Sequence, residues 1–207
     1  HAYYTARLID ASFNDRDFTP VFASSNIKIY PFQVAAAAFA LKSSYQKGVI
    51  LCDEAGMGKS HEAMLVITQK WLEGCKNILL CIPNSDLLVQ WTELLDTYYT
   101  IPYVALTNNE MYSDNGNSFE QDGIIISTYD FVCEHKSDAL SVNWDLTVFE
   151  EANALSNVYQ EDIKQAKILK LIAEGSFKLL LTGTPIEKNI MDLYGMMYFI
   201  DETVLPD

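Results

Sequence analysis

A short glycine-containing loop has the residues needed to bind a phosphate group. It runs from Asp53 to Ser60, reads D-E-A-G-M-G-K-S, and follows a short apolar run. Gly56 and Gly58 let the backbone turn its N–H groups toward an anion, and a helix beginning here adds partial positive charge. Lys59 can reach the outer phosphates of a nucleotide, and the Ser60 hydroxyl can bind Mg²⁺. Asp53 stands where the strict pattern has glycine, so the alternative is a simple turn before an ordinary helix.

Two adjacent carboxylates follow a second apolar run. Residues Val148 to Asn153 read V-F-E-E-A-N. At the end of a strand in the sheet that carries the phosphate loop, such a pair suits metal binding and activation of water. Glu150 would hold Mg²⁺ through a water molecule, and Glu151 would orient or deprotonate the attacking water. The alternative, which is favoured for an isolated Glu-Glu pair, is a solvated acidic turn.

Two further segments carry polar side chains that suit a nucleotide site. Residues Leu181 to Pro185 read L-T-G-T-P, and hydroxyls beside Gly183 can sense a γ-phosphate and relay its presence through hydrogen bonds. Upstream, residues Pro31 to Gln33 read P-F-Q, and an amide side chain can both donate to and accept from an adenine edge. Taken alone, the first segment could be a simple turn and the second carries no information. The order of all four segments along the chain gives them weight.

The elements that must position these residues alternate between strands and helices. The apolar runs show no period-two alternation, which predicts strands covered on both faces. This pattern is typical of an α/β fold with a mostly parallel sheet flanked by helices, where ligands bind at the carboxyl ends of the strands. Residues 1–26 form an N-terminal extension in which Tyr4, Leu8, Ile9 and Phe13 could line a short helix, and residues 107–122 form a loop. The predicted strands are 49–52, 78–82, 103–106, 124–127, 146–149 and 179–181, and the predicted helices are 33–43, 59–72, 87–98, 163–173 and 190–200, with a short helix after Tyr129.

Composition sets further bounds. The chain has 207 residues, of which 49% are apolar, which is enough for one core and too apolar for a disordered segment. With 28 acidic and 14 basic residues the net charge is −14, which argues against a free-standing nucleic-acid-binding protein. The four cysteines and three histidines have no metal-ligand spacing, so we expect reduced thiols and no zinc site. No apolar stretch approaches the roughly 18 residues of a membrane span, so we expect no membrane partner and a cytoplasmic location.

In this order and spacing, the segments resemble the first RecA-like lobe of superfamily-two helicases, and within them the SWI/SNF-type DNA-dependent ATPases. The resemblance is greatest to bacterial members near the RNA-polymerase-associated ATPase. It implies a RecA-like P-loop domain over residues 27–207, with ATP and Mg²⁺ bound, hydrolysis coupled to translocation on double-stranded DNA, and nucleoid association. RNA polymerase or another DNA-bound complex is the implied partner. The resemblance is carried by P-F-Q, D-E-A-G-M-G-K-S, N-I-L-L-C-I-P with L-L-V-Q-W, I-I-I-S-T-Y-D, and the run from Leu179 to Asp201.

The resemblance also implies roles for single positions. Glu151 and Lys59 would be catalytic, and Ser60 and Glu150 would bind Mg²⁺. For two of the implied DNA contacts, Gln90 and Tyr129, the alternatives are helix surface and core packing. ATP binding is implied for Gln33, Glu54, Ala55, Gly56, Met57, Gly58, Lys59 and Ser60; coupling for Asn153, Thr182, Gly183 and Thr184; and DNA contact for Pro83, Gln90, Thr128 and Tyr129.

Departures from the family pattern leave a second hypothesis open. The chain has E-E-A-N where the family has D-E-A-H, so Glu150 places a longer side chain at a demanding Mg²⁺ site, and Asn153 cannot carry a proton. Tyr30 and Ala154 stand where the family commonly has arginine. We expect a second lobe, whose arginines complete the ATP site, to lie outside these residues. The second hypothesis is therefore a degenerate nucleotide-binding or partner-docking module with little hydrolysis.

Two other interpretations are less favoured. A P-loop kinase or GTPase is disfavoured because the chain has no N-K-x-D guanine motif and does have L-T-G-T-P. Lys164, Lys167 and Lys170 lie three residues apart on one predicted helix. They could contact phosphates, but a solvated helix face is the favoured interpretation.

Overall fold

Six parallel strands form the centre of the molecule. The computed structural model describes residues 29–43, 46–107, 116–160 and 164–203. Within them the sheet has the order β1-β6-β5-β2-β4-β3, and every neighbouring pair is parallel. This confirms the predicted α/β fold. The strands are β1 (Gly48–Leu51), β2 (Asn77–Ile82), β3 (Tyr103–Leu106), β4 (Gly123–Thr128), β5 (Leu146–Phe149) and β6 (Phe177–Leu181).

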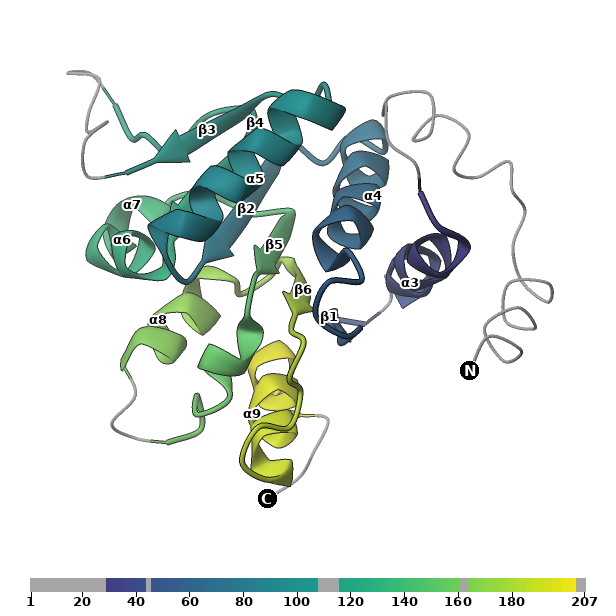
Figure 1. The fold of residues 1–207 in the computed structure, drawn as a ribbon. Coiled ribbons are helices and arrows are strands. Elements are labelled where there is room, and N and C mark those ends of the chain that lie inside the picture. Colours follow the sequence, from purple (N-terminus) through teal and green to yellow (C-terminus); the bar gives the residue numbers. More distant parts are fainter. Residues whose placement is uncertain (1–28, 44–45, 108–115, 161–163, 204–207) are drawn as a thin grey trace.

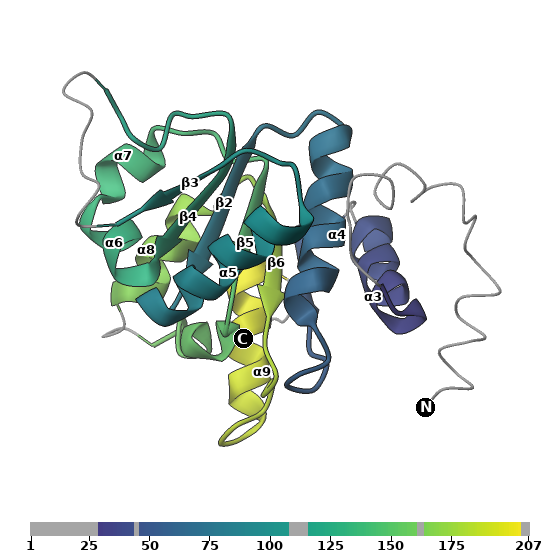
Figure 2. The same ribbon diagram turned by 45° about the horizontal axis from the view of Figure 1, so that its top comes forward.

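Helices cover both faces of this sheet, as Figures 1 and 2 show. One face packs against α3, α4 and α5 in a core that includes Met64, Leu80 and Trp91. The other packs against α6 to α9 in a core that includes Phe149 and Phe199. The helices are α3 (Pro31–Lys42), α4 (Lys59–Leu72), α5 (Ser85–Tyr98), α6 (Tyr129–Glu134), α7 (Lys136–Leu140), α8 (Lys164–Ile172) and α9 (Ile190–Ile200), with a 3₁₀ helix, η3 (Ala152–Leu155).

Burial on both faces explains the continuous apolar strands. All four residues of β5 are buried, and in β2 only the first residue is partly exposed. A parallel strand between two helical layers has no solvent-facing side, so polar alternation would place unpaired polar groups in a core. All six strands therefore deliver their carboxyl ends to one edge of the sheet.

The predicted elements agree with the observed ones to within two residues at each described boundary. Two elements were not predicted: α7 and η3 are five and four residues long, too short to show a helical period in the sequence. The N-terminal extension, residues 1–26, and half of the predicted loop at 107–122, residues 108–115, lie outside the described residues. Among the described helices, none is long and apolar enough to cross a membrane.

Candidate functional site

The glycine-containing loop links the end of β1 to the start of α4. Gly56 and Gly58 both have positive φ angles, of 84° and 87°, in the left-handed region that favours glycine. A Cβ atom at Gly58 would also lie 2.5 Å from the side-chain nitrogen of Gln33. Gly58 is thus required for its backbone conformation and for its close contact with α3. The loop leads into the N-terminus of α4, where unpaired backbone N–H groups favour an anion.

Lys59 lies at the centre of the site and is almost buried. Its Nζ donates to the backbone carbonyl oxygens of Asp53, at 3.0 Å, and of Glu54, at 3.4 Å. Gly183 approaches from the loop after β6, since a Cβ there would lie 3.4 Å from Lys59 Nζ and 3.5 Å from Ala55 N. The fold therefore brings the predicted L-T-G-T-P segment against the phosphate loop. Thr184 N donates to Thr182 Oγ1 at 3.1 Å, which shapes this second loop.

Gln33 connects α3 to the phosphate loop. The side chain is 3% exposed, accepts from Tyr30 N at 3.0 Å, and donates to the Met57 carbonyl oxygen at 3.0 Å. Both ends of the amide are therefore engaged with backbone groups that border the loop. Adenine recognition by Gln33 stays a prediction. The remaining loop residues of the predicted ATP site, Glu54, Ala55 and Met57, are exposed.

The two adjacent carboxylates follow β5 at the same edge of the sheet. Glu150 is buried, and its Oε2 has no hydrogen-bond partner among the described residues. Burial and the neighbouring Glu151 raise the pKa of Glu150 to about 7, while Lys59 and the Trp91 indole N–H act in the opposite direction. Glu151 has a φ angle of 51°, which is uncommon for a residue with a side chain and is typical of functional sites.

This carboxylate pair has the chemistry that Mg²⁺ requires. A cation supplies the compensating charge that the buried, unpartnered Glu150 oxygen lacks. Hard oxygen ligands such as carboxylates and hydroxyls are those that Mg²⁺ prefers. The residues that would hold the ion are Glu150 and Ser60, the second of which is partly exposed at the start of α4. The donor set therefore fits a magnesium ion.

A second buried carboxyl lies on α4 and was missed from the sequence. Glu62 is fully buried, and its pKa is raised to about 8 by burial and by the adjacent Asp53 carboxyl, with Lys59 opposing. The one feature of the sequence that could have pointed to Glu62 is Asp53, which places a carboxyl where the strict phosphate-loop pattern has glycine. One turn into the helix, Glu62 faces it. The phosphate loop is therefore bordered by two carboxyl groups close together.

The stability of the metal-free chain should fall as the pH rises from about 5 to 8. In that window the folded state holds a proton on Glu62 that the unfolded state, with a carboxyl pKa near 4.5, releases. Glu62→Gln is expected to reduce this pH-dependent loss in the free energy of unfolding by on the order of 2 kcal/mol, after allowance for solvent screening. Urea unfolding at several pH values measures it. The exposed Glu93 on α5 gives the control, Glu93→Gln, and an equal slope in both variants would contradict the prediction.

Of the residues expected to couple the two loops, Asn153 lies in η3 and Thr182 directly follows β6. Thr182 is fully buried, and the Oδ1 of Asn153 is buried with no hydrogen-bond partner among the described residues. The glycine of α9, Gly195, packs on η3 so closely that a Cβ would overlap the Ser156 carbonyl oxygen. The segments that follow the Glu150–Glu151 pair and the L-T-G-T-P loop are therefore in direct contact.

The predicted DNA contacts fall at the ends of β2 and β4. These strands pair so that Ile82 lies beside Thr128, which places Pro83 next to the end of β4. Thr128 is partly exposed and caps α6 by accepting from Phe131 N at 3.2 Å. Gln90 is exposed on α5. Three of the four positions thus offer surface at one edge of the sheet.

Tyr129 requires a correction. Its side chain is 2% exposed, packs against Phe149, and its hydroxyl donates to the Glu150 carbonyl oxygen at 2.7 Å. The core-packing alternative therefore describes Tyr129, because a side chain buried to this extent cannot reach DNA. Its hydroxyl holds the peptide unit between the two carboxylates, beside the unusual backbone of Glu151.

Tyr129→Phe is expected to lower ATP turnover of the intact protein by about tenfold with a smaller change in KM. Without the hydroxyl, the Glu150 carbonyl loses a buried hydrogen bond of about 1–2 kcal/mol and the carboxylate pair is held less rigidly. Steady-state kinetics separate the two constants. Tyr103→Phe is the matched control, since its hydroxyl donates to Asp96 away from the site. Equal turnover in both variants would remove Tyr129 from the positioning role.

Comparison with known proteins gives concordant results. A family model described as "SNF2-related domain" matches residues 32–207. An uncharacterized ATP-dependent helicase of Bacillus subtilis, YqhH, is 30% identical over 72% of this chain and 25% of its own length. The RNA polymerase-associated protein RapA of Serratia proteamaculans is 28% identical over 79% of this chain and 18% of its own length. The chain thus spans about a quarter or less of these relatives.

A solved structure is also similar. The Sulfolobus solfataricus SWI2/SNF2 ATPase core in complex with double-stranded DNA superposes with a TM-score of 0.72 at 23% identity. The match covers 86% of this chain and 36% of that one. At this identity the likeness supports the fold alone, in agreement with the RecA-like arrangement of sheet and helices described above.

Proposed function

The chain belongs to the SNF2-related domain family, and we propose on that premise that it is the ATP-binding lobe of an ATPase that moves on double-stranded DNA. One observation carries the proposal. Lys59 of the phosphate loop, Gly183 of the L-T-G-T-P loop and the Glu150–Glu151 pair meet at one edge of the sheet. This constellation suits phosphoryl transfer, which depends on positioning and charge stabilisation rather than on covalent chemistry by the protein.

In this proposal each residue of the site has a defined task. The backbone N–H groups from Glu54 to Gly58 and the amine of Lys59 bind the phosphates of ATP, and Gln33 contacts the adenine. Glu150 and Ser60 hold Mg²⁺, which when bound neutralises phosphate charge. Glu151 orients the attacking water and accepts its proton. Thr182, Gly183, Thr184 and Asn153 transmit the nucleotide state to the DNA-binding edge.

The DNA-binding edge is proposed from the same family membership. Pro83, Gln90 and Thr128 would contact the phosphate backbone of duplex DNA, while Tyr129 acts beneath them. The net charge of −14 supports a local contact shared with other parts of a longer protein, since a lobe this acidic attracts DNA poorly by itself. RNA polymerase or another DNA-bound complex is the proposed partner, in a bacterial cytoplasm at the nucleoid.

The test is ATP hydrolysis by the full-length protein with and without duplex DNA. We expect duplex DNA to raise turnover, and Lys59→Ala to abolish both basal and stimulated activity. We expect this chain alone to turn over ATP slowly, because an arginine finger from a second lobe is worth orders of magnitude in such reactions. A full-length protein that hydrolyses ATP at a rate independent of DNA would contradict the proposal.

The second candidate is a nucleotide-binding module with little hydrolysis. It is favoured by the E-E-A-N sequence at Glu150 to Asn153, where the longer metal-binding side chain can displace Mg²⁺. The double variant Glu150→Asp with Asn153→His separates the candidates in the full-length protein. A large gain in turnover supports the module, and brisk turnover before substitution rules it out.

A further inference from the structure

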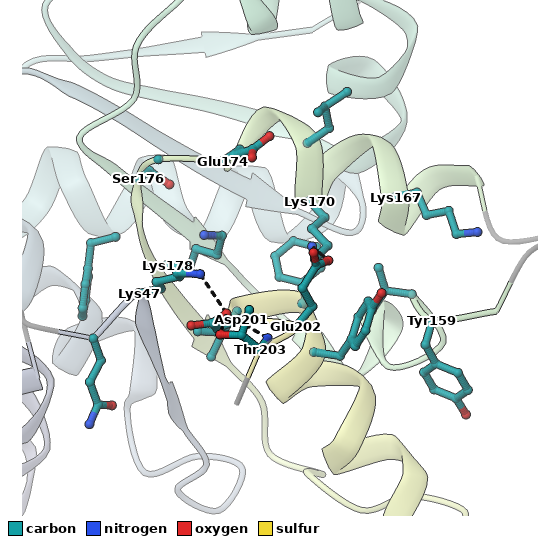
Figure 3. A pocket seen from close by; sticks show the side chains of 18 residues that line it. Lys47, Tyr159, Lys167, Lys170, Glu174, Ser176, Lys178, Asp201, Glu202 and Thr203 are labelled. Carbon is teal, nitrogen blue, oxygen red and sulfur yellow. Dashed lines mark hydrogen bonds and ion pairs between the residues drawn. The ribbon is translucent and has the colours of Figure 1, made fainter. Parts of the chain in front are cut away.

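A cavity lies at the edge of the sheet opposite the phosphate loop. It is bordered by residues at the amino ends of β1 and β6 and by the carboxyl ends of α8 and α9, as Figure 3 shows. Its volume is about 1020 Å³, at the upper end of the range for small-molecule sites, about 300–1,000 Å³. Because parallel strands run from this edge to the other, the cavity is separated from the nucleotide site by the length of the sheet.

Lysines dominate the charge of this cavity. Four of them line it, Lys47, Lys167, Lys170 and Lys178, against three carboxylates, Glu174, Asp201 and Glu202. The chain as a whole has twice as many acidic as basic residues. The cavity therefore has a small excess of positive charge, from β6, α8 and the residue before β1, against the overall balance of the protein.

Two of these lysines are already neutralised by ion pairs. Lys47 contacts Asp201 at 2.8 Å, and Lys170 contacts Glu202 at 2.8 Å. Figure 3 shows Lys47, Lys178 and Asp201 together at one side of the cavity. The two acidic partners follow α9 directly. These ion pairs show that an oxygen anion can reach each of the two amines.

Lys178, in contrast to Lys47 and Lys170, has no ion-pair partner among the described residues. The residue is 4% exposed, and its backbone N–H donates to the Lys47 carbonyl oxygen at 3.0 Å, while its side chain makes no hydrogen bond or ion pair within the described residues. Burial lowers the pKa of its amine, Lys170 and Lys47 lower it further, and Asp201 and Glu174 oppose the change. Its Cβ packs beside Gly48, where any side chain would overlap the Lys178 backbone. The amine of a largely buried lysine that faces a cavity without a partner lacks the anion that would compensate its charge.

We propose that this cavity is a binding site for a phosphate group, presented by a small phosphomonoester and held by Lys178, with Lys47 and Lys170 exchanging the carboxylates of Asp201 and Glu202 for phosphate oxygens. The volume exceeds that of a single oxyanion, which leaves room for an organic part of the ligand. Tyr159 and Tyr198 also line the cavity and provide ring surface for that part. The proposal is independent of the nucleotide site, because none of the predicted ATP-binding residues contributes to it.

Calorimetric titration with ribose 5-phosphate, adenosine monophosphate and inorganic phosphate tests the site. We expect Lys178→Met to weaken ribose 5-phosphate binding by about tenfold or more, since a charge-assisted hydrogen bond is lost. Lys59→Ala separates this site from the phosphate loop and should leave binding unchanged. Lys164→Met is the matched control, because Lys164 is exposed on α8 and does not line the cavity.

The outcomes are distinct. Tighter binding of ribose 5-phosphate than of inorganic phosphate supports a phosphomonoester, and equal binding supports free phosphate as the source of the same group. Loss of binding in Lys59→Ala with retention in Lys178→Met assigns it to the nucleotide site and overturns the proposal. A titration followed by amide NMR in the unsubstituted chain needs no variant to fold. It should shift Lys178 and Asp201, and unchanged signals there would also overturn the proposal.

Discussion

Glu151→Gln is expected to lower ATP turnover of the full-length protein by about 10² to 10⁴-fold, while ATP affinity changes by less than about twofold. The amide keeps the shape of the side chain but cannot accept a proton from the attacking water. Binding is retained because the groups that hold the phosphates, Lys59 and the loop backbone, are untouched. Single-turnover hydrolysis and equilibrium binding of ATP measure the two quantities separately.

A matched substitution makes this prediction specific. Glu120 is an exposed carboxylate outside the site, so Glu120→Gln changes the net charge equally and should leave turnover unchanged. If Glu151→Gln retained the turnover of the unsubstituted protein, Glu151 would have no role in proton transfer. The low-hydrolysis hypothesis would then be favoured, since residual activity would come from phosphate binding alone.

Gly195→Ala is expected to destabilise the chain by about 3 kcal/mol, which corresponds to a melting temperature lower by roughly 6–12 °C. The added methyl group would overlap the Ser156 carbonyl oxygen, and both partners are backbone in regular elements. Because Ser156 directly follows η3, relief of this overlap would shift α9 relative to η3. Because Phe199 and Leu155 are fully buried in the same core, the displacement would spread into it.

Thermal unfolding with a second alanine substitution checks this effect. Gly116 has no heavy atom within 4 Å of the position that a Cβ would take, so Gly116→Ala should change the melting temperature little. A similar melting temperature for the two variants would show that α9 and η3 do not pack as described. We also expect Gly195→Ala to weaken ATP-dependent coupling, because α9 and η3 continue from the two loops at the nucleotide site.

Sequence reasoning predicted the scaffold well because the scaffold obeys simple patterns. Buried parallel strands are continuous apolar runs, and the glycines and lysine of the phosphate loop have fixed spacing. The family resemblance is confirmed by the SNF2-related domain match over residues 32–207. The features that could not be predicted depend on contacts between segments that are far apart in the sequence. The hydrogen bond from Tyr129 to Glu150 and the approach of Glu62 to Asp53 arise only when strands and helices are assembled.

Lys178 is a further residue whose environment could not be predicted from the sequence. The sequence F-K-L-L-L predicts a strand beginning at Leu179. In the structure β6 begins at Phe177 and Lys178 is buried. The sequence favours a solvated face for Lys164, Lys167 and Lys170. In the structure Lys164 and Lys167 are exposed and Lys170 is partly buried, and Lys167 and Lys170 also line the cavity.

The two carbonyl groups that accept from the amine of Lys59 influence which anions the loop can bind. In the proposed ATP complex, phosphate oxygens would replace the carbonyls of Asp53 and Glu54 as acceptors, so the number of hydrogen bonds made by the amine would change little. The gain comes from charge, because an anionic oxygen is a stronger acceptor than a neutral one. The carbonyl oxygens of the loop thus compete with an incoming phosphate for the amine of Lys59. Its selectivity between triphosphate and weaker anions is set by what can displace the protein's own backbone.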